Sequence, residues 1–185
     1  MATIYTIGHS TRSFDELVAA LSGHGIVTLA DVRSFPMSRR LPHFNREALQ
    51  AELPKRGINY VWMKGLGGRR KKIFADSPNI ALRNDSFRNY ADYMMTDEFT
   101  QGIECLVEIA AYEKTAYMCA ERVHFQCHRM LISDYLTAHG HTVLHIDDER
   151  RAPREHKLMT EARLVDGKLV YDGGEGRSLP LAFGP

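Results

Sequence analysis

Residues 115–140 read TAYMCAERVHFQCHRMLISDYLTAHG and join a short apolar run to a helical pattern through a turn rich in reactive side chains. TAYM is typical of a buried strand, and the spacing after the turn is that of a helix ending near a glycine. The turn, CAERVHFQCHR (119–129), holds two cysteines, two histidines, a glutamate and two arginines. We therefore predict a strand over 115–119 and a helix over 127–139, with chemistry concentrated between them.

The same alternation continues on both sides of this stretch. Ser13 and Glu16 form a capping-box pattern that predicts a helix, and Asn45 precedes a short helix that Pro54 and Gly57 end. A helical pattern runs with breaks from Tyr90 to Tyr112, whereas residues 64–89 are predicted to be an irregular excursion with short helical turns. Further strands are predicted over 3–8, 26–33, 58–63 and 141–146.

Strands that alternate with helices indicate a parallel sheet covered on both faces. We predict a single α/β domain over residues 1–185, three-layered, with a central, mostly parallel sheet of about five strands. Residues 149–185 form its C-terminal tail. In the tail, Asp166 and Gly167 stand between two apolar stretches and predict a hairpin with a type I′ turn.

Length and composition are those of a globular domain. The 185 residues are 44% hydrophobic and 25% charged, and no apolar run approaches the roughly 20 residues that span a membrane. MATIYTIGHS has no basic stretch before an apolar one, so we expect a cytoplasmic protein without a membrane partner. Three cysteines are an odd count, which argues against a disulfide framework, and Cys105 is expected in the core.

The charge distribution is uneven despite a net charge of +1. Residues 33–72 contain eleven basic and two acidic residues, a net charge of +9, so the rest of the chain carries −8. Such a segment can attract phosphates or nucleic acid, or it can be a solvated face balanced by acids elsewhere in the fold.

The carboxyl ends of parallel strands share one edge of the sheet, where ligands of α/β proteins bind. Polar residues follow every predicted strand. They are His9 and Ser10; Asp31, Arg33 and Ser38; Lys64, Gly67, Gly68 and Arg69; Cys119, Glu121, Cys127, His128 and Arg129; and His145 and Asp147. Cysteine and histidine are unusual in generic loops, so this convergence predicts an active or binding site.

Several motifs resemble one family. TIGHS (6–10), DVRSFPMS (31–38), LGG (66–68), CAE and CHR (119–129) and GHTVLHI (140–146) are similar to the bacterial and archaeal domain of unknown function 488. The resemblance covers about 3–148 and implies no chemical roles. Its characteristic positions are His9, Ser10, Asp31, Arg33, Pro36, Gly67, Gly68, Cys119, Glu121, Cys127, His128 and Arg129.

The first hypothesis is an enzyme, a hydrolase or transferase, that acts on an anionic, phosphate-bearing substrate. That substrate would be a small ligand such as a nucleotide, or a nucleic acid. A cysteine at a helix N-terminus beside Arg and His should be partly thiolate, as a nucleophile requires. The catalytic residues would be Cys127, Cys119, His128, Glu121, Asp31 and His9. The substrate-binding residues would be Ser10, Arg33, Ser38, Gly67, Gly68, Arg69 and Arg129. The arginine spacing does not match the C-x5-R loop of cysteine phosphatases.

Two alternatives stay open. Cys119, Cys127 and His128 could bind iron or zinc, since thiolates and imidazole suit both metals. Alternatively, the basic segment near Tyr60 and Trp62 could make a non-enzymatic nucleic-acid-binding module, although both aromatic residues are expected to be at least half buried. The remaining histidines with no predicted role are expected at the surface or at helix ends: His124, His139, His141 and His156.

Overall fold

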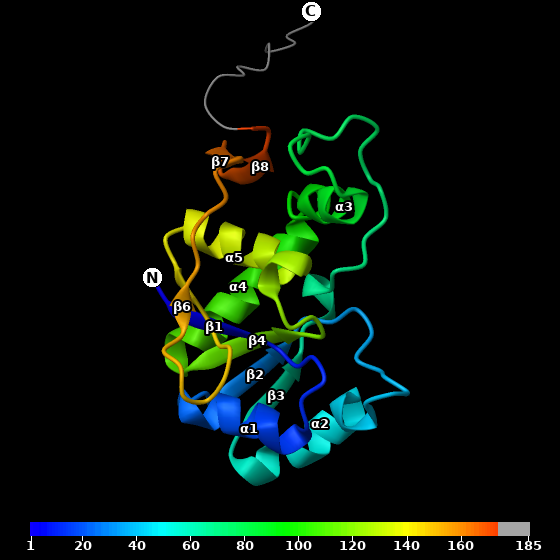
Figure 1. Ribbon diagram of the computed structural model, residues 1–185. Coiled ribbons are helices and arrows are strands. Elements are labelled where there is room, and N and C mark those ends of the chain that lie inside the picture. The colour runs from blue at the N-terminus through cyan, green and yellow to red at the C-terminus, as the bar shows by residue number, and fades with distance from the viewer. Residues whose placement is uncertain (174–185) are drawn as a thin grey trace, which may run out of the picture.

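A six-stranded central sheet organises the chain, for which the computed structural model describes residues 1–173 (Figure 1). The strand order is β3-β2-β4-β1-β5-β6, with the first five strands parallel and β6 antiparallel to β5. The strands are β1 (Thr3–Gly8), β2 (Thr28–Asp31), β3 (Asn59–Trp62), β4 (Thr115–Cys119), β5 (Thr142–His145) and β6 (Arg154–Glu155). The predicted mostly parallel α/β fold is confirmed, with one edge strand more than expected.

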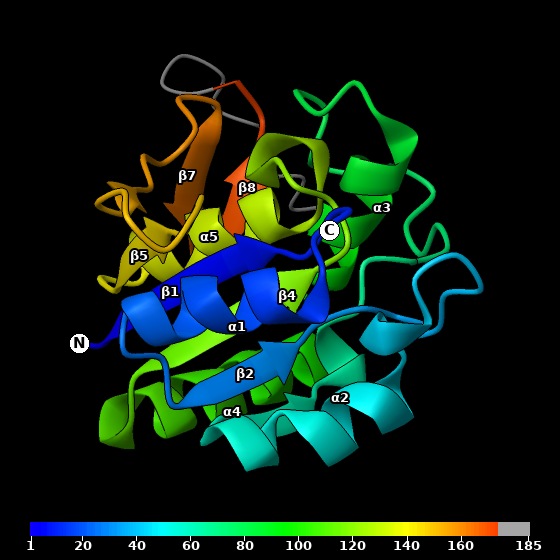
Figure 2. The same ribbon diagram turned by 60° about the horizontal axis from the view of Figure 1, so that its bottom comes forward.

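Helices cover both faces of the sheet and complete three layers (Figure 2). The helices α1 (Phe14–Gly23) and α2 (Arg46–Glu52) pack on one face over a core that includes Leu21 and Leu49. The other face carries α3 (Asp85–Tyr93), α4 (Asp97–Tyr112) and α5 (Arg129–Ala138) over a second core. Buried on both sides, the central strands form from near-continuous apolar runs.

The chain connections diverge at the carboxyl end of β4. The chain leaves β1 and β2, the two neighbours of β4, for helices on one face. It leaves β4 for α5 on the opposite face. Ligands of doubly wound sheets bind where neighbouring connections part in this way. Cys119, the last residue of β4, therefore lies at the position that the topology favours for a site.

A separate hairpin of β7 (Ala162–Val165) and β8 (Lys168–Tyr171) packs near α3 and α5. Asp166 and Gly167 both have positive φ, 49° and 77°, as a type I′ turn requires, so the predicted hairpin is confirmed. Tyr171 is fully buried, and its backbone N–H donates to Oδ1 of Asn79 at 3.0 Å.

Local hydrogen bonds set the helix starts. The capping box of α1 is present: the Ser13 hydroxyl accepts from Glu16 N at 3.2 Å, and the Glu16 carboxylate accepts from Ser13 N at 2.6 Å. Helix α3 begins at Asp85, so the prediction of irregular structure through residue 89 was wrong at its end. The Asn84 side chain caps this helix: its Oδ1 accepts from the backbone N–H groups of Ser86 and Phe87.

Two further expectations need correction. The helix after β4 begins at Arg129 rather than Cys127, because Cys127 is extended after the 3-10 turn η4 (His124–Gln126). Cys105 is exposed on α4, because Phe99, Ile103 and Leu106 form the buried side of that helix. Strand β2 is also shorter than the predicted 26–33. Within residues 1–173, none of the helices combines the length and apolar character needed to cross a membrane.

Candidate functional site

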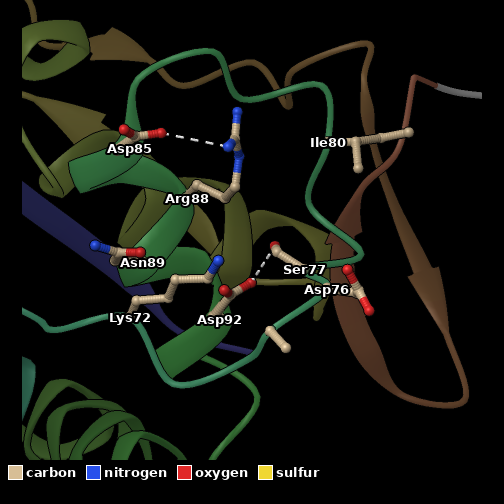
Figure 3. A pocket seen from close by; sticks show the side chains of 9 residues that line it. Lys72, Asp76, Ser77, Ile80, Asp85, Arg88, Asn89 and Asp92 are labelled. Carbon is tan, nitrogen blue, oxygen red and sulfur yellow. Dashed lines mark hydrogen bonds and ion pairs between the residues drawn. The ribbon is translucent and has the colours of Figure 1, made fainter.

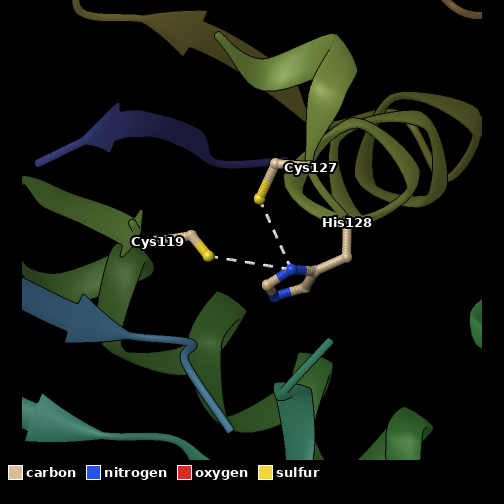
Figure 4. A group of neighbouring side chains, drawn as sticks. All are labelled: Cys119, Cys127 and His128. Carbon is tan, nitrogen blue, oxygen red and sulfur yellow. Dashed lines mark hydrogen bonds between the residues drawn. The ribbon is translucent and has the colours of Figure 1, made fainter. Parts of the chain in front are cut away.

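Cys119, Cys127 and His128 converge at the carboxyl end of β4 (Figure 4). The Nδ1 atom of His128 lies 3.4 Å from Sγ of Cys127 and 3.8 Å from Sγ of Cys119. All three side chains are buried, and their candidate ligand atoms lie within 4.8 Å of one another. Residues nine positions apart in sequence thus form one cluster.

The opposite ring nitrogen anchors the His128 ring. Its Nε2 lies 2.9 Å from the carbonyl oxygen of Val32, which can only accept a hydrogen bond. Nε2 therefore carries a proton, and Nδ1 faces both sulfurs. The Val32 carbonyl orients the imidazole in the way that outer-shell groups orient metal-binding histidines.

The two thiols have opposite tendencies to ionise. A hydrogen bond from Cys119, assisted by His128 and Arg129, holds the pKa of Cys127 well below its ordinary value. The adjacent Cys127 sulfur and burial raise the pKa of Cys119. The pair therefore holds its negative charge on Cys127, while Cys119 keeps a proton that it donates to the thiolate.

Asp31 and Arg33 form a buried ion pair beside this cluster. The guanidinium Nε donates to Oδ1 of Asp31 at 2.8 Å, and NH2 donates to Oδ2 of Asp31 and to the Phe44 carbonyl. The Tyr60 hydroxyl also donates to Oδ2 of Asp31, at 2.7 Å, and burial raises the pKa of this tyrosine. Partners within the protein thus occupy the Asp31 carboxylate and most of the Arg33 guanidinium.

His9 is a neutral ring attached to the same network. Its Nδ1 donates to the Ser10 carbonyl at 2.9 Å, and Nε2 accepts from NH1 of Arg33 at 3.3 Å. Burial, followed by the charge of Arg33, lowers the pKa of His9 to about 4. The ring stacks on Phe44, and Ser10 has a positive φ of 50°.

Arg129 acts as a brace in this arrangement. It is 2% exposed, and NH2 donates to the carbonyl oxygens of Glu121 and Arg122 at 2.5 and 3.2 Å, while NH1 donates to Thr6. These bonds hold the turn after β4 against β1. The Glu121 side chain itself is exposed.

A cavity of about 570 Å³ opens over the cysteine cluster. Its lining residues are Arg33, Ser34, Phe35, Met37, Gly68, Arg69, Ser86, Phe87, Cys119, Ala120, Glu121, Gln126, Cys127 and His128. An adjoining cavity of about 360 Å³ shares Arg33, Phe35 and Glu121 with it, and is lined also by His9, Ser10 and Ser38. The cysteine cluster thus lies at one end of a divided hollow along the sheet edge.

The glycines after β3 make room for this arrangement. A β-carbon on Gly67 would lie 2.6 Å from Oγ of Ser34, and one on Gly68 would lie 2.4 Å from Nδ1 of His128. Arg69 is exposed at the cavity, and its N–H donates to the Ser34 hydroxyl at 2.9 Å. The residues proposed from the sequence thus lie along one edge of the sheet. Ser38, like His9 and Ser10, lines the adjoining cavity and not the cavity over the cysteines, and its hydroxyl accepts from Leu41 N.

Another cavity, of about 610 Å³, lies between α3 and the 64–84 excursion, the largely irregular segment after β3 (Figure 3). Asp92 on its wall accepts from the Ser77 hydroxyl and from the Asn79 amide, at 2.5 and 2.7 Å. These bonds fasten the excursion to α3. No cysteine or histidine lines this cavity.

Sequence reasoning missed several members of the site. Tyr60 was expected to be at least half buried, with no contact to Asp31 foreseen; its hydroxyl donates to Asp31, and its alternation on β3 gave no signal for that contact. The expectation that His156 is a surface residue was wrong: it is 7% exposed and bonds Asp134. His124 is half-buried and stacks on His145, because the turn after β4 folds back over β5.

Comparison with known proteins gives one match. The model of the family described as "Domain of unknown function DUF488" matches residues 13–136. Neither the curated proteins nor the solved structures contain a match to this chain. The matched region includes the cysteine cluster, Asp31, Arg33 and both glycines, whereas His9 and Ser10 precede it. Because the match covers well over half of the sequence, the chain belongs to the DUF488 family.

Proposed function

We propose that this protein is a metal-dependent enzyme whose zinc or iron ion is bound by Cys119, Cys127 and His128. The observation that carries the proposal is the position of His128 Nδ1, which faces both sulfurs at 3.4 and 3.8 Å while Nε2 is held by Val32. Two thiolates and one imidazole are a ligand set that zinc and iron accept. Three protein ligands leave a coordination position open, as in catalytic sites.

The burial of the cluster favours this reading over a nucleophilic cysteine. Cys127 is 4% exposed and Cys119 is 8% exposed, so neither sulfur is well placed to attack a large substrate. The lowered pKa of Cys127 is equally what a metal ligand needs, because thiolate is the binding form. A small substrate that reaches the sulfur directly remains the competing function, and the experiment below separates the two.

The surrounding polar groups have positioning roles in this proposal. Arg33 donates hydrogen bonds to both Asp31 and His9, and Arg129 donates to backbone carbonyls. They keep β1, β2 and the turn after β4 in register around the metal ligands. Glu121 is different: its exposed carboxylate borders both cavities and is free to act as the general base or acid.

The cavity walls favour an anionic substrate with an apolar or flat part. Arg69 supplies an exposed positive charge, and Phe35, Met37 and Phe87 supply apolar surface. Phe35 and Met37 are 67% and 78% exposed. A nucleotide or another phosphate ester has both features. A metal held by Cys119, Cys127 and His128 would supply Lewis-acid activation of water. Glu121 would accept the proton of a water whose oxygen bonds to phosphorus, and would donate that proton to the leaving-group oxygen as its bond to phosphorus breaks.

Nucleic acid is a second candidate ligand for the same edge. The loop that carries Phe35 also exposes Arg39 and Arg40, and the Arg69 guanidinium lies 5.7 Å from the centre of the Phe35 ring. An aromatic ring among cations is the combination that binds single strands. Other members of the basic segment are engaged within the protein, since Arg33 pairs with Asp31 and Arg56 with Asp15. The slope of log affinity against log salt tests this candidate, and a slope near zero would exclude it.

Elemental analysis of untagged protein, purified without chelator, tests the proposed function. We expect zinc or iron at about one ion per chain at this site, reduced by Cys127→Ser and by Cys119→Ser. Cys105→Ser is the matched control, because Cys105 is exposed on α4. Metal content that is unchanged in the two site variants, or metal-free protein that gains none when zinc or iron is added, would reject the metal and favour a thiolate enzyme.

A further inference from the structure

A second group of histidines lies beside β5, outside the cysteine cluster. His124 comes from the turn after β4, His145 ends β5, and His156 follows β6. One nitrogen from each ring lies within 4.8 Å of the others. His145 Nε2 is 3.0 Å from His156 Nδ1, and the rings of His124 and His145 stack at 3.6 Å. Three imidazoles from separate segments are thus brought together.

A buried carboxylate orients one of these rings. Nε2 of His156 lies 2.8 Å from Oδ1 of Asp134, which is fully buried on α5. Asp134 also accepts from the Tyr171 hydroxyl at 3.0 Å and from Met159 N at 3.1 Å. The carboxylate keeps the proton on Nε2, so Nδ1 of His156 presents a lone pair toward His145. This is the carboxylate–histidine arrangement found behind metal-binding histidines.

His145 has an unused nitrogen. If its Nε2 donates to His156, its Nδ1 is a bare lone pair, and among the described residues this buried atom has no hydrogen-bond partner. Leaving such an atom unpaired is unfavourable. A small cavity of about 70 Å³ adjoins the ring and is also lined by His124. It has room for a water molecule, which fills about 30 Å³ in the liquid.

We propose that His124, His145 and His156 form a second metal site, for zinc or a similar divalent ion, that fastens the segment 146–171 to the sheet. The ion replaces the hydrogen bond between His145 Nε2 and His156 Nδ1. The proton moves to Nδ1 of His145, so the ring stays neutral and can donate to water in the small cavity. His124, which is only half-buried, turns from its stacked position to supply the third nitrogen.

The neighbouring charges act on a cation in both directions. Arg129 and Arg154 line the small cavity beside the histidines and oppose a cation there, although Arg154 is paired with Asp147 at 3.1 Å. The Asp134 carboxylate behind His156 favours a cation. None of the three histidines belongs to the cysteine cluster, so metal binding at this site can be tested independently of the proposed function.

The test uses untagged protein carrying Cys119→Ser and Cys127→Ser, which removes the first site. Calorimetric titration with Zn²⁺ should show one ion per chain, and Co²⁺ should bind without a sulfur-to-cobalt absorption band. In this background, Asp134→Asn should weaken binding by about 10- to 100-fold, the usual effect of losing an outer-shell carboxylate. His145→Gln and His124→Ala should weaken it further, whereas the exposed His139→Gln should leave it unchanged.

Circular dichroism establishes that each variant is folded, and His124→Ala is the least disruptive of them because this residue is half-buried. If the Cys119→Ser, Cys127→Ser protein is folded and binds neither Zn²⁺ nor Co²⁺, the second site does not exist. The same conclusion follows if binding is equal in the His124→Ala, His145→Gln and His139→Gln variants.

Discussion

The backbone of Gly68 crosses the imidazole of His128 so closely that a β-carbon at position 68 would lie 2.4 Å from Nδ1. Gly68→Ala must therefore displace the ring or the loop. We expect a loss of metal affinity of at least tenfold and a destabilisation of about 1–3 kcal/mol, as for overpacked cores. Gly65→Ala in the same loop is the control, because its added carbon would be 3.9 Å from the nearest atom, the Glu98 carbonyl oxygen. A Co²⁺ titration followed by the sulfur-to-cobalt absorption band, which reports only the cysteine site, and urea unfolding measure the two effects. Equal behaviour of the two variants would contradict this packing.

The Asp31–Arg33 pair should contribute strongly to stability because both side chains are buried. Asp31→Asn leaves the Arg33 charge without its counter-ion, and we expect the free energy of unfolding to fall by about 3–5 kcal/mol. The exposed pair of Asp15 and Arg56 provides the comparison, and Asp15→Asn should cost less than about 1 kcal/mol. Urea denaturation at constant pH separates these outcomes, and similar losses in both variants would show that the buried pair has no special weight.

The state of His9 predicts how stability depends on pH. Its pKa in the folded protein is about 4, below the ordinary value of 6.5, so the unfolded chain binds this proton more readily. The contribution is fully present above pH 6.5 and is lost as pH falls toward 4, by an amount on the order of 3 kcal/mol. His9→Gln should flatten this part of the stability profile. Nuclear magnetic resonance should show neutral His9 at pH 5.5; a His9 ring that titrates near 6.5 in folded protein would contradict the prediction.

The three cysteines should react with iodoacetamide in a defined order. Cys105 is exposed and should be modified first. Cys119 and Cys127 should be protected while metal is bound. After chelation, Cys127 should react before Cys119, because its pKa is lowered and that of Cys119 is raised. Peptide mass spectrometry gives the order, and equal labelling of all three in metal-loaded protein would exclude both cysteines as ligands.

The sequence was sufficient for the five parallel strands of the sheet, because each is a short apolar run bounded by turn residues; the two-residue edge strand β6 has no such pattern. The capping box at Ser13 and the turn at Asp166 and Gly167 are local signals, and both are confirmed. The start of α3 was missed because Asn84 lies inside a polar excursion without apolar periodicity. Cys105 was misplaced because a lone cysteine in a helix does not itself identify the buried side.

The site was predictable in its location but not in its bonding. Parallel strands bring their carboxyl ends to one edge, so the convergence of Cys119, His9 and Asp31 follows from the topology. The sequence does not show that the Asp31 carboxylate is occupied by Arg33 and Tyr60, since these contacts depend on side-chain directions on two neighbouring strands. The histidine cluster was missed for a related reason: residues 124, 145 and 156 meet only when the turn and the tail fold over β5.

The most direct test of the metal proposal is a Co²⁺ titration of the metal-free protein, followed by optical absorption. Coordination by Cys119 and Cys127 predicts an intense near-ultraviolet sulfur-to-cobalt band that saturates at one ion per chain. The band should be lost in the Cys119→Ser, Cys127→Ser protein and kept in Cys105→Ser. Folded, reduced protein that binds Co²⁺ without this band, or binds none, would contradict the account.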